Sequence, residues 1–280
     1  MNILNTRVEF VNAQLKKIEE IINSEEPVQI KSDFKVGVDL GTSNVVVMVI
    51  DSEGIPVAAF LEWADVVRDG IVFDFWNAVR IVKSLISKAE RKCNISIKYI
   101  STSYPPGTDP YTSINVIKSA GFEIGNVVDE PSSFATLLNL FDGAVVDIGG
   151  GTTGISVVKN GKIIYTADEP TGGKHVSLTI AGNQKITLEE ADIIKRSERA
   201  ADLKAIVFPV FEKMTDIVSK HLIGNDVEKI FLTGGTCCFP GIKEIFMREF
   251  PDKEIILPYN PLYSTPFSIA SYKNHLDIEK

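Results

Sequence analysis

The sequence predicts an α/β fold of two related lobes that face a central cleft. Two observations lead to this prediction. An aspartate followed by small residues and glycines occurs at 39–44 and again at 147–154, an offset of 108 positions (147 − 39). Each copy is flanked by apolar runs of strand length, and both are followed by strands and then by alternating helices and strands. This repeated order indicates a duplication, with 34–142 as the first lobe and 143–262 as the second.

Composition narrows the class of protein. The chain has 280 residues, enough for two domains of ordinary size, and its hydrophobic share of 44% suits a folded core. A formal net charge of −8 disfavours a nucleic-acid partner, because phosphate backbones need a basic surface. The apolar run at 45–50 is too short to span a membrane, and charges between 9 and 20 interrupt any signal sequence. Three cysteines, two of them adjacent, form no disulfide framework, so we expect a cytoplasmic protein.

The N-terminal segment carries a helical repeat. Apolar residues spaced three and four apart predict an amphipathic helix over 5–26 that ends before Pro27. We expect this extension, residues 1–33, to pack on the body of the protein. An arm that docks a partner is the alternative.

The elements of the two lobes follow from changes in the apolar period. A strand at 34–40 delivers Asp39 to its end, and the other strands expected in the first lobe lie at 45–50, 55–61, 97–101 and 127–128. The helices expected there span 76–92, 113–120 and 132–140. In the second lobe we expect strands at 144–148, 155–158, 163–166, 230–233 and 255–257. Its helices are expected at 188–196, 203–221 and 241–249, with a last helix at 267–273.

The glycine string at 149–154 has competing interpretations. It matches G-x-G-x-x-G, but the dinucleotide fingerprint needs a helix directly after it, and here a strand pattern follows. The sequence contains no Walker-type G-x-x-x-x-G-K-[ST] string. The remaining functional interpretation is a β-hairpin loop that holds phosphate through its backbone N–H groups. The simpler alternative is a tight turn capped by the aspartate. Two copies in the same strand–loop–strand setting favour phosphate loops.

Asp39 and Asp147 lie at the strand ends beside these loops. We expect their carboxylates to hold Mg²⁺ through water, because Mg²⁺ keeps much of its hydration shell. The backbone N–H groups expected to face phosphate oxygens are those of Gly41, Thr42, Gly149, Gly150, Gly151 and Thr152.

The two loops resemble the phosphate motifs of the actin, Hsp70 and FtsA superfamily of ATPases. Asp39-Leu-Gly-Thr-Ser-Asn is similar to the first motif and Asp147-Ile-Gly-Gly-Gly-Thr to the second. Other segments resemble, in the family's order, a connecting helix, a glycine pair, an adenosine motif and a segment that returns to the first lobe; they lie at 129–135, 171–176, 232–241 and 266–271. The resemblance implies duplicated ribonuclease H-like lobes around a nucleotide cleft, with residues 263–280 returning to the first lobe.

The resemblance also implies roles for single residues. Glu130 would orient the water that attacks ATP, with Asp147 as a second catalytic carboxylate, although Glu-Pro is also a common strand-to-helix boundary. Asp192 and Lys195 would contact the ribose, although their spacing is also that of an exposed ion pair on a helix. With ATP or ADP and Mg²⁺ as cofactors, the implied nucleotide contacts are Asp39, Gly41, Thr42, Ser43, Asn44, Gly149, Gly150, Gly151, Thr152, Gly172, Gly173, Asp192, Lys195, Gly234, Gly235 and Thr236.

A narrower resemblance concerns the segments 60–72, 101–110 and 167–173. They are similar to the EutJ family of chaperonin-like proteins, which are encoded with ethanolamine-utilisation genes. That family's context is a bacterial microcompartment that houses ethanolamine breakdown. The resemblance implies ethanolamine-utilisation enzymes or microcompartment shell proteins as partners. It is compatible with a monomer and with an oligomer.

Several departures from the superfamily pattern weaken the expectation of rapid hydrolysis. Cys238 stands where Hsp70 proteins have an arginine against adenine, so we expect weak nucleotide affinity. Hsp70 proteins have a lysine that contacts phosphate, and only the positive charge of Arg68 makes it a candidate for the same role here. The alternative is that Arg68 is a solvated charge on the surface. About 80 residues separate the second loop from the adenosine motif, too few for the subdomain that helps Hsp70 or actin to grip adenosine.

Three functional classes follow. The first is an ATP-binding, weakly hydrolysing clamp that assists assembly or reactivation of the ethanolamine-utilisation machinery. The second is a non-catalytic adaptor of the same fold that recruits partners through its surface or its N-terminal helix. A small-molecule kinase ranks last, because no carboxylate base for an acceptor hydroxyl is evident in the sequence.

Overall fold

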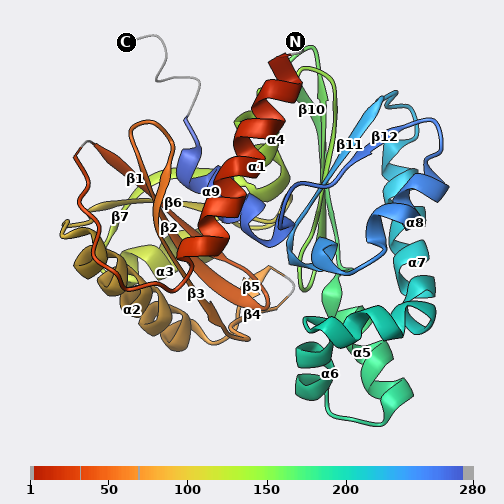
Figure 1. The fold of residues 1–280 in the computed structure, drawn as a ribbon, viewed down its shortest axis with the longest axis horizontal. Coiled ribbons are helices and arrows are strands. Elements are labelled where there is room, and N and C mark those ends of the chain that lie inside the picture. The colour runs from red at the N-terminus through yellow and green to blue at the C-terminus, as the bar shows by residue number, and fades with distance from the viewer. Residues whose placement is uncertain (1–2, 32, 69, 274–280) are drawn as a thin grey trace.

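Two five-stranded sheets of the same design form the centre of the molecule (Figure 1). The structure is a computed structural model and describes residues 3–31, 33–68 and 70–273. The strand orders are β3-β2-β1-β6-β7 and β10-β9-β8-β11-β12. In each sheet three antiparallel strands that follow one another in the chain are extended by two parallel strands. The predicted α/β fold of two duplicated lobes is confirmed.

The strands lie close to their predicted positions. Those of the first sheet are β1 (Phe34–Leu40), β2 (Asn44–Asp51), β3 (Pro56–Trp63), β6 (Tyr99–Tyr104) and β7 (Glu123–Asp129). Those of the second sheet are β8 (Gly143–Ile148), β9 (Thr153–Lys159), β10 (Lys162–Glu169), β11 (Lys229–Thr233) and β12 (Glu254–Ile256). A short hairpin that was not predicted joins β4 (Val67–Arg68) to β5 (Ile71–Val72).

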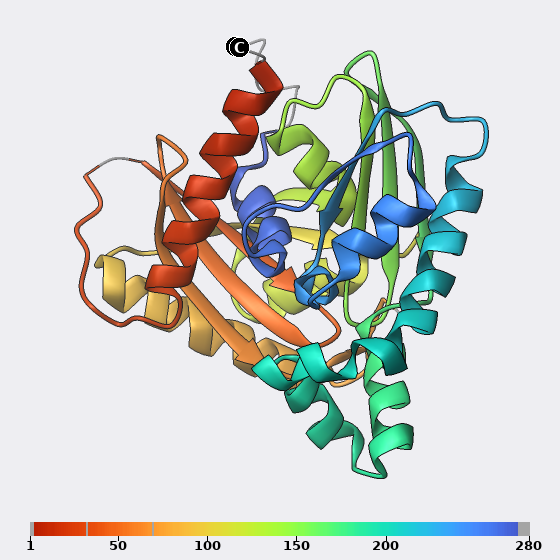
Figure 2. The ribbon, with the colours of Figure 1, turned by 45° about the vertical axis from the view of Figure 1, so that its right-hand side comes forward.

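Helices cover the outer face of each sheet and also fill the space between the sheets (Figures 1 and 2). The outer helices are α2 (Phe75–Cys93) and α3 (Tyr111–Ser119) on the first lobe, with α7 (Lys204–Leu222) and α8 (Ile242–Glu249) on the second. Helices α5 (Gly173–Gln184) and α6 (Leu188–Lys195) extend the second lobe below the end of its sheet, where α6 packs on α5 (Figure 1). The inner helices are α1 (Ile3–Ile21), α4 (Glu130–Leu137) and α9 (Ser264–Ser271). Three short 3₁₀ turns are η1 (Glu198–Leu203), η2 (Gly235–Cys238) and η3 (Pro261–Tyr263).

The hydrophobic core has three parts, and the third joins the two lobes. One part lies under the outer helices of each lobe. The third brings side chains from both sheets together with the inner helices; its largest members include Met48, Phe134, Phe231 and Phe267. Because burial of apolar surface is the main stabilising force in folding, this shared core holds the lobes together on the side away from the loops.

Helix α1 packs on the body of the protein, as we expected for the N-terminal extension. Leu15 and Ile18 are fully buried in the shared core. On the helix surface, Asn12 Oδ1 accepts a hydrogen bond from Tyr259 N at 2.8 Å, and Glu19 accepts one from Asn260 at 2.8 Å. The helix ends at Ile21 rather than at 26, because Asn23 adopts a left-handed conformation with φ 56°.

Helix α9 brings the end of the described chain back to the first sheet. It packs directly on β1 at Gly37, where an added Cβ would lie 2.6 Å from the backbone nitrogen of Ala270. Only glycine permits so close an approach of helix and strand. Residues 274–280, which the resemblance also assigns to this returning segment, lie outside the described residues. Among the residues that are described, none of the helices combines the length and apolar character that a membrane span requires.

Candidate functional site

The two aspartate–glycine loops are closed by equivalent backbone hydrogen bonds. In the first loop Gly41 N donates to Asn44 O at 3.0 Å, and in the second Gly149 N donates to Thr152 O at 2.9 Å. Both residues of the second pair lie 108 positions after those of the first, the offset of the sequence repeat. These hairpin bonds use the N–H groups of Gly41 and Gly149, so these two amides do not face a phosphate as we expected. The other predicted amides lie nearer the loop tips.

The tips of the two loops meet across the cleft. A Cβ on Gly151 would lie 2.8 Å from Thr42 Oγ1, and a Cβ on Gly150 would overlap Ser43 Oγ. The glycines are therefore needed because hydroxyl side chains of the first loop fill the adjacent space. Loops from opposite lobes that touch in this way can grip one small anionic group between them.

A cleft of about 330 Å³ lies between the lobes at these loops. Fifteen of the eighteen predicted site residues line it: Asp39, Gly41, Thr42, Ser43, Asn44, Glu130, Asp147, Gly149, Gly150, Thr152, Asp192, Lys195, Gly234, Gly235 and Thr236. They come from β1, α4, β8, α6 and the turn after β11, so the fold collects segments that are far apart in the sequence.

The other three predicted residues, Gly151, Gly172 and Gly173, do not line the cleft. Gly172 and Gly173 lie behind the second loop, where Gly173 N donates to Gly149 O at 3.0 Å. A Cβ on Gly172 would lie 2.7 Å from that same carbonyl oxygen. This pair therefore supports the loop from behind, because Gly173 is hydrogen-bonded to the loop and Gly172 packs against it.

Asp147 is a buried carboxylate held by hydroxyl groups from two directions. Thr233, at the end of β11, donates to Asp147 Oδ2 at 2.9 Å, and Thr265 of α9 donates to the same oxygen. Burial raises the pKa of Asp147, and these two hydrogen bonds counteract part of the rise. The carboxylate is thus positioned from both the second sheet and the returning helix.

Asp39 and Glu130 share the electrostatic environment of Asp147. Burial and the nearby Asp147 raise the pKa of Asp39 to about 7, against a hydrogen bond from Ser103 that lowers it. Burial also raises the pKa of Glu130 well above its ordinary value, and the charges of Asp39 and Asp147 raise it further. Three carboxylates that repel one another, two of them buried and Glu130 partly buried, favour binding of a cation or a proton.

A fourth carboxylate, Asp168 of β10, was missed at the sequence level. Asp147 pairs with Gly154 across β8 and β9, and Gly154 pairs with Asp168 across β9 and β10. Residues directly opposite in a sheet share a face, so Asp168 points to the side of Asp147 with only a glycine between. Its Oδ1 atom is buried and has no hydrogen-bond partner among the described residues, and burial raises its pKa to about 6.

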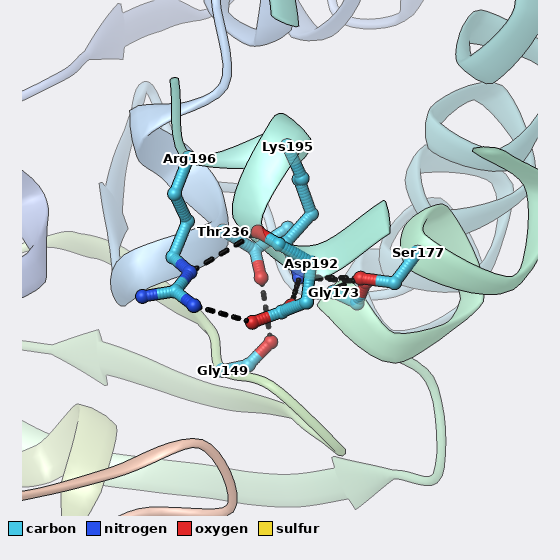
Figure 3. A network of polar contacts seen from close by, with 7 residues as sticks. All are labelled: Gly149, Gly173, Ser177, Asp192, Lys195, Arg196 and Thr236. Carbon is cyan, nitrogen blue, oxygen red and sulfur yellow. Dashed lines mark hydrogen bonds and ion pairs between the residues drawn. The ribbon is translucent and has the colours of Figure 1, made fainter. Parts of the chain in front are cut away.

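Asp192 and Lys195 form part of a polar network behind the second loop (Figure 3). Lys195 Nζ lies 2.7 Å from Asp192 Oδ1 and donates to Gly173 O at 3.0 Å. Thr236 Oγ1 donates to Gly149 O at 2.7 Å. With exposed fractions of 11% for Lys195 and 28% for Asp192, the pair is not the exposed surface pair of the alternative interpretation. Burial lowers the pKa of Lys195, and Asp192 opposes that shift.

The segment that follows β10 lines the cleft beside α6. The segment between β10 and α7 forms α5, α6 and η1, and its residues Arg196, Ser197 and Ala200 line the cleft. This short stretch therefore contributes to the wall of the cleft, while the expectation that it lacks the added subdomain of Hsp70 or actin stays a prediction. Cys238 also lines the cleft, as its place in the adenosine motif suggested.

Arg68, the candidate for a phosphate-contacting cation, is not brought to the cleft. It forms an ion pair with Asp65 at 3.1 Å, lies against the ring of Phe73 and is half exposed. The surface-charge alternative is the one that the structure supports. Among the residues described, no three His, Cys, Asp or Glu side chains converge tightly enough to bind a metal ion directly.

Comparison with known proteins identifies the family. The ethanolamine utilization protein EutJ of Escherichia coli (strain K12) is 50% identical over 248 residues, which cover 89% of each chain. The EutJ protein of Salmonella typhimurium (strain LT2) is 47% identical over 262 residues, 94% of this chain and 93% of the relative. This chain belongs to the EutJ family.

Solved structures and family models relate this EutJ family member to actin-like proteins. The crystal structure of EutJ from Carboxydothermus hydrogenoformans has a TM-score of 0.89 and 42% identity, covering 95% of this chain and 99% of that one. MreB5 of Spiroplasma citri bound to AMPPNP has a TM-score of 0.71 at 17% identity, covering 89% and 98%, which shows a shared fold. The model of the type IV pilus assembly protein PilM matches residues 141–262, and that of the MreB/Mbl protein matches residues 61–188.

Proposed function

We propose that this EutJ family member is an ATP-binding clamp that hydrolyses ATP slowly and assists assembly or reactivation of the ethanolamine-utilisation machinery of a bacterial microcompartment. One observation carries the proposal: two hairpin loops closed by equivalent hydrogen bonds, one from each lobe, meet beside buried carboxylates in a single cleft. In this proposal the two lobes, residues 34–142 with 263–273 and residues 143–262, open and close around the nucleotide.

The loop tips are the proposed site of the phosphate chain. Their backbone amides and the hydroxyls of Thr42 and Ser43 supply hydrogen-bond donors without adding net charge. The MreB5 structures of the same fold are bound to AMPPNP and to ADP, which supports a nucleotide as the ligand. The base and ribose would lie toward α6 and η2, where Asp192 and Lys195 reach the cleft.

The carboxylates fit a hydrated Mg²⁺ ion. Asp39 and Asp147 present oxygen atoms, the ligands that Mg²⁺ prefers, and their mutual repulsion would be relieved by a cation. When bound with ATP, Mg²⁺ neutralises charge on the phosphate oxygens. The residues Asp39 and Asp147 would hold it through its water shell, in keeping with the absence of a direct three-residue ligand group among the described residues.

Glu130 is the proposed water-positioning residue. It begins α4 directly after β7 and lines the cleft. Pro131 lies next to Gly154, where a Cβ would be 3.2 Å from the proline ring, so the start of α4 is held against β9 beside Asp147. A carboxylate in this place can accept a hydrogen bond from the water that attacks the terminal phosphate.

The biological context of the proposal comes from the family. Relatives of 47% and 50% identity over most of the chain are named ethanolamine utilization proteins. We therefore place the clamp with ethanolamine-utilisation enzymes or microcompartment shell proteins as its clients.

Phosphate release from Mg²⁺-ATP tests the hydrolytic part. Glu130→Gln keeps the size of the side chain and removes its basicity, so release should fall about 100-fold or more. Glu123→Gln, an exposed change on β7, is the matched control and should leave the rate unchanged. Equal release from Glu130→Gln and the unmodified protein would remove Glu130 from the mechanism.

An adaptor that keeps the fold without turnover is the second candidate. It is favoured by the contact of Thr42 and Ser43 with the opposite glycines, which leaves little space between the loop tips. The N-terminal helix is a poor docking arm for such an adaptor, because its apolar face is buried in the shared core. Binding of ATP without measurable phosphate release would favour this candidate.

A further inference from the structure

Arg196 and Trp63 contact each other across the mouth of the cleft. The guanidinium carbon of Arg196 lies 3.7 Å from the centroid of the Trp63 ring. Trp63 ends β3 of the first sheet, whereas Arg196 caps α6 of the second lobe, and both line the cleft. A planar guanidinium over an indole face is a favourable cation–π contact. This contact therefore joins the two lobes on the side where the cleft opens.

The guanidinium of Arg196 is held in place by its own lobe (Figure 3). Arg196 Nε donates to Asp192 O at 3.1 Å, and its terminal nitrogen lies 3.0 Å from Asp192 Oδ2. The other carboxylate oxygen of Asp192 pairs with Lys195. Because two of the three guanidinium nitrogens are held by Asp192, the stack on Trp63 costs little additional ordering of the arginine.

The same network reaches the second loop. Lys195 donates to Gly173 O, and Gly173 N donates to Gly149 O, the carbonyl that also accepts from Thr236. A chain of hydrogen bonds and ion pairs thus runs from the loop through Lys195 and Asp192 to Arg196. Polar networks of this kind are one physical route by which two sites influence each other.

We propose that the Arg196–Trp63 stack is a latch that holds the two lobes closed, and that the Asp192–Lys195 pair couples this latch to the second loop. The shared core with α1, α4 and α9 joins the lobes on the opposite side, so opening at the mouth requires release of the stack but not of that core. Trp63 is 43% exposed, so the latch is weak enough to open readily. The proposal goes beyond nucleotide binding, since it concerns a contact between side chains of the two lobes.

Hydrogen exchange of the loop amides, measured without nucleotide, tests the latch. Residues 41–43, 149, 150 and 152 line the cleft and are separate in sequence from both latch residues; Asn44 is left out because it pairs with Trp63 between β2 and β3. Arg196→Ala and Trp63→Leu should each speed their exchange about two- to fivefold, the effect of losing one partly exposed cation–π contact. The double variant should exchange no faster than either single variant, because both changes remove the same contact.

Two exposed residues, Arg199 and Trp76, provide matched controls. Arg199→Ala and Trp76→Leu should leave loop exchange unchanged, whereas Asp192→Asn should speed it, because it releases the guanidinium. Unchanged exchange in Arg196→Ala, or effects of Arg196→Ala and Trp63→Leu that simply add, would overturn the latch. Failure of ATP to bind would overturn the proposed function instead and would leave this measurement intact.

Discussion

Thr265 donates a hydrogen bond to Asp147 across 118 positions of the chain and so connects helix α9 to the strand that leads into the second loop. Thr233 donates to the same oxygen from the neighbouring strand. The charge of Asp147 is thus stabilised by groups that only the folded chain brings together. The returning helix therefore helps to build the site and does more than close the fold.

Removal of the Thr265 hydroxyl should destabilise the protein. Thr265→Val keeps the shape of the side chain but removes a hydrogen bond to a buried charged group, a loss of about 1.5–3 kcal/mol. Unfolding in urea at pH 8 measures the change. Thr265→Ser retains the hydroxyl and should lose much less than Thr265→Val. Equal stability of the valine and serine variants would show that the hydroxyl does not support Asp147.

Two glycines near helix α5 should respond to alanine in opposite directions. A Cβ on Gly172 would lie 2.7 Å from Gly149 O, so Gly172→Ala must displace the second loop or α5 and should lower stability. Gly182 lies inside α5 with open space around it, so Gly182→Ala should raise stability by up to about 1 kcal/mol. Thermal unfolding of both variants checks the pair. A tolerated alanine at 172 would contradict the supporting role of this glycine.

Stability without divalent cations should fall as the pH rises. Burial and Asp147 raise the pKa of Asp39 from 3.8 to about 7, so between these values the folded protein binds a proton that the unfolded chain has released. Stability is then highest near the lower value and declines until the pH passes about 7. We expect a loss on the order of a few kcal/mol between pH 5 and pH 8 in EDTA.

The Asp39 contribution is isolated by comparing Asp39→Asn with the unmodified protein at each pH. The asparagine variant should show a flatter profile, and the unmodified protein should recover stability at pH 8 when Mg²⁺ is added. Parallel profiles for the two proteins would contradict the assignment of this pH dependence to Asp39.

Lys195 should contribute to stability beyond an ordinary surface lysine. Lys195→Met removes a mostly buried charge that pairs with the partly buried Asp192 and donates to Gly173 O, so we expect a loss of about 1–3 kcal/mol. Lys220→Met, at an exposed position of α7, is the control and should change stability by less than about 0.5 kcal/mol. Unfolding in urea measures the stability of both variants. An equal loss of stability in the two would show that Lys195 contributes no more than an ordinary surface lysine.

The sequence was sufficient for the strands and the loops, because both are local. The apolar residues before Asp39 and Asp147 predicted strands that end beside these aspartates. The 108-residue offset of the two copies also separates the hydrogen bonds that close the two hairpins. Helix α5 was missed because its sequence combines two glycines with β-branched residues, which have low helix propensity. Its stability comes from burying Val176 and Ile180 against the second lobe, which local pattern does not reveal.

Asp168 and the Arg196–Trp63 contact were beyond sequence reasoning for a different reason. A shift in register between Ile163 and Tyr165 places Asp168, and not Ala167, opposite Gly154. One inserted residue of this kind reverses which side chains face the site, and it follows from tertiary packing rather than from the hairpin turn. The contact between Arg196 and Trp63 depends on how far the lobes close, which no local pattern specifies.

Calorimetric titration of Mg²⁺-ATP into the purified protein tests the central claim most directly. We predict a saturable one-site binding heat at ATP concentrations up to about millimolar, with affinity reduced tenfold or more (about 1.4 kcal/mol) in Asp39→Asn. Asp51→Asn, which changes an aspartate at the far end of strand β2, should bind as the unmodified protein does. The absence of binding heat at millimolar Mg²⁺-ATP would contradict the proposal that this cleft is a nucleotide site.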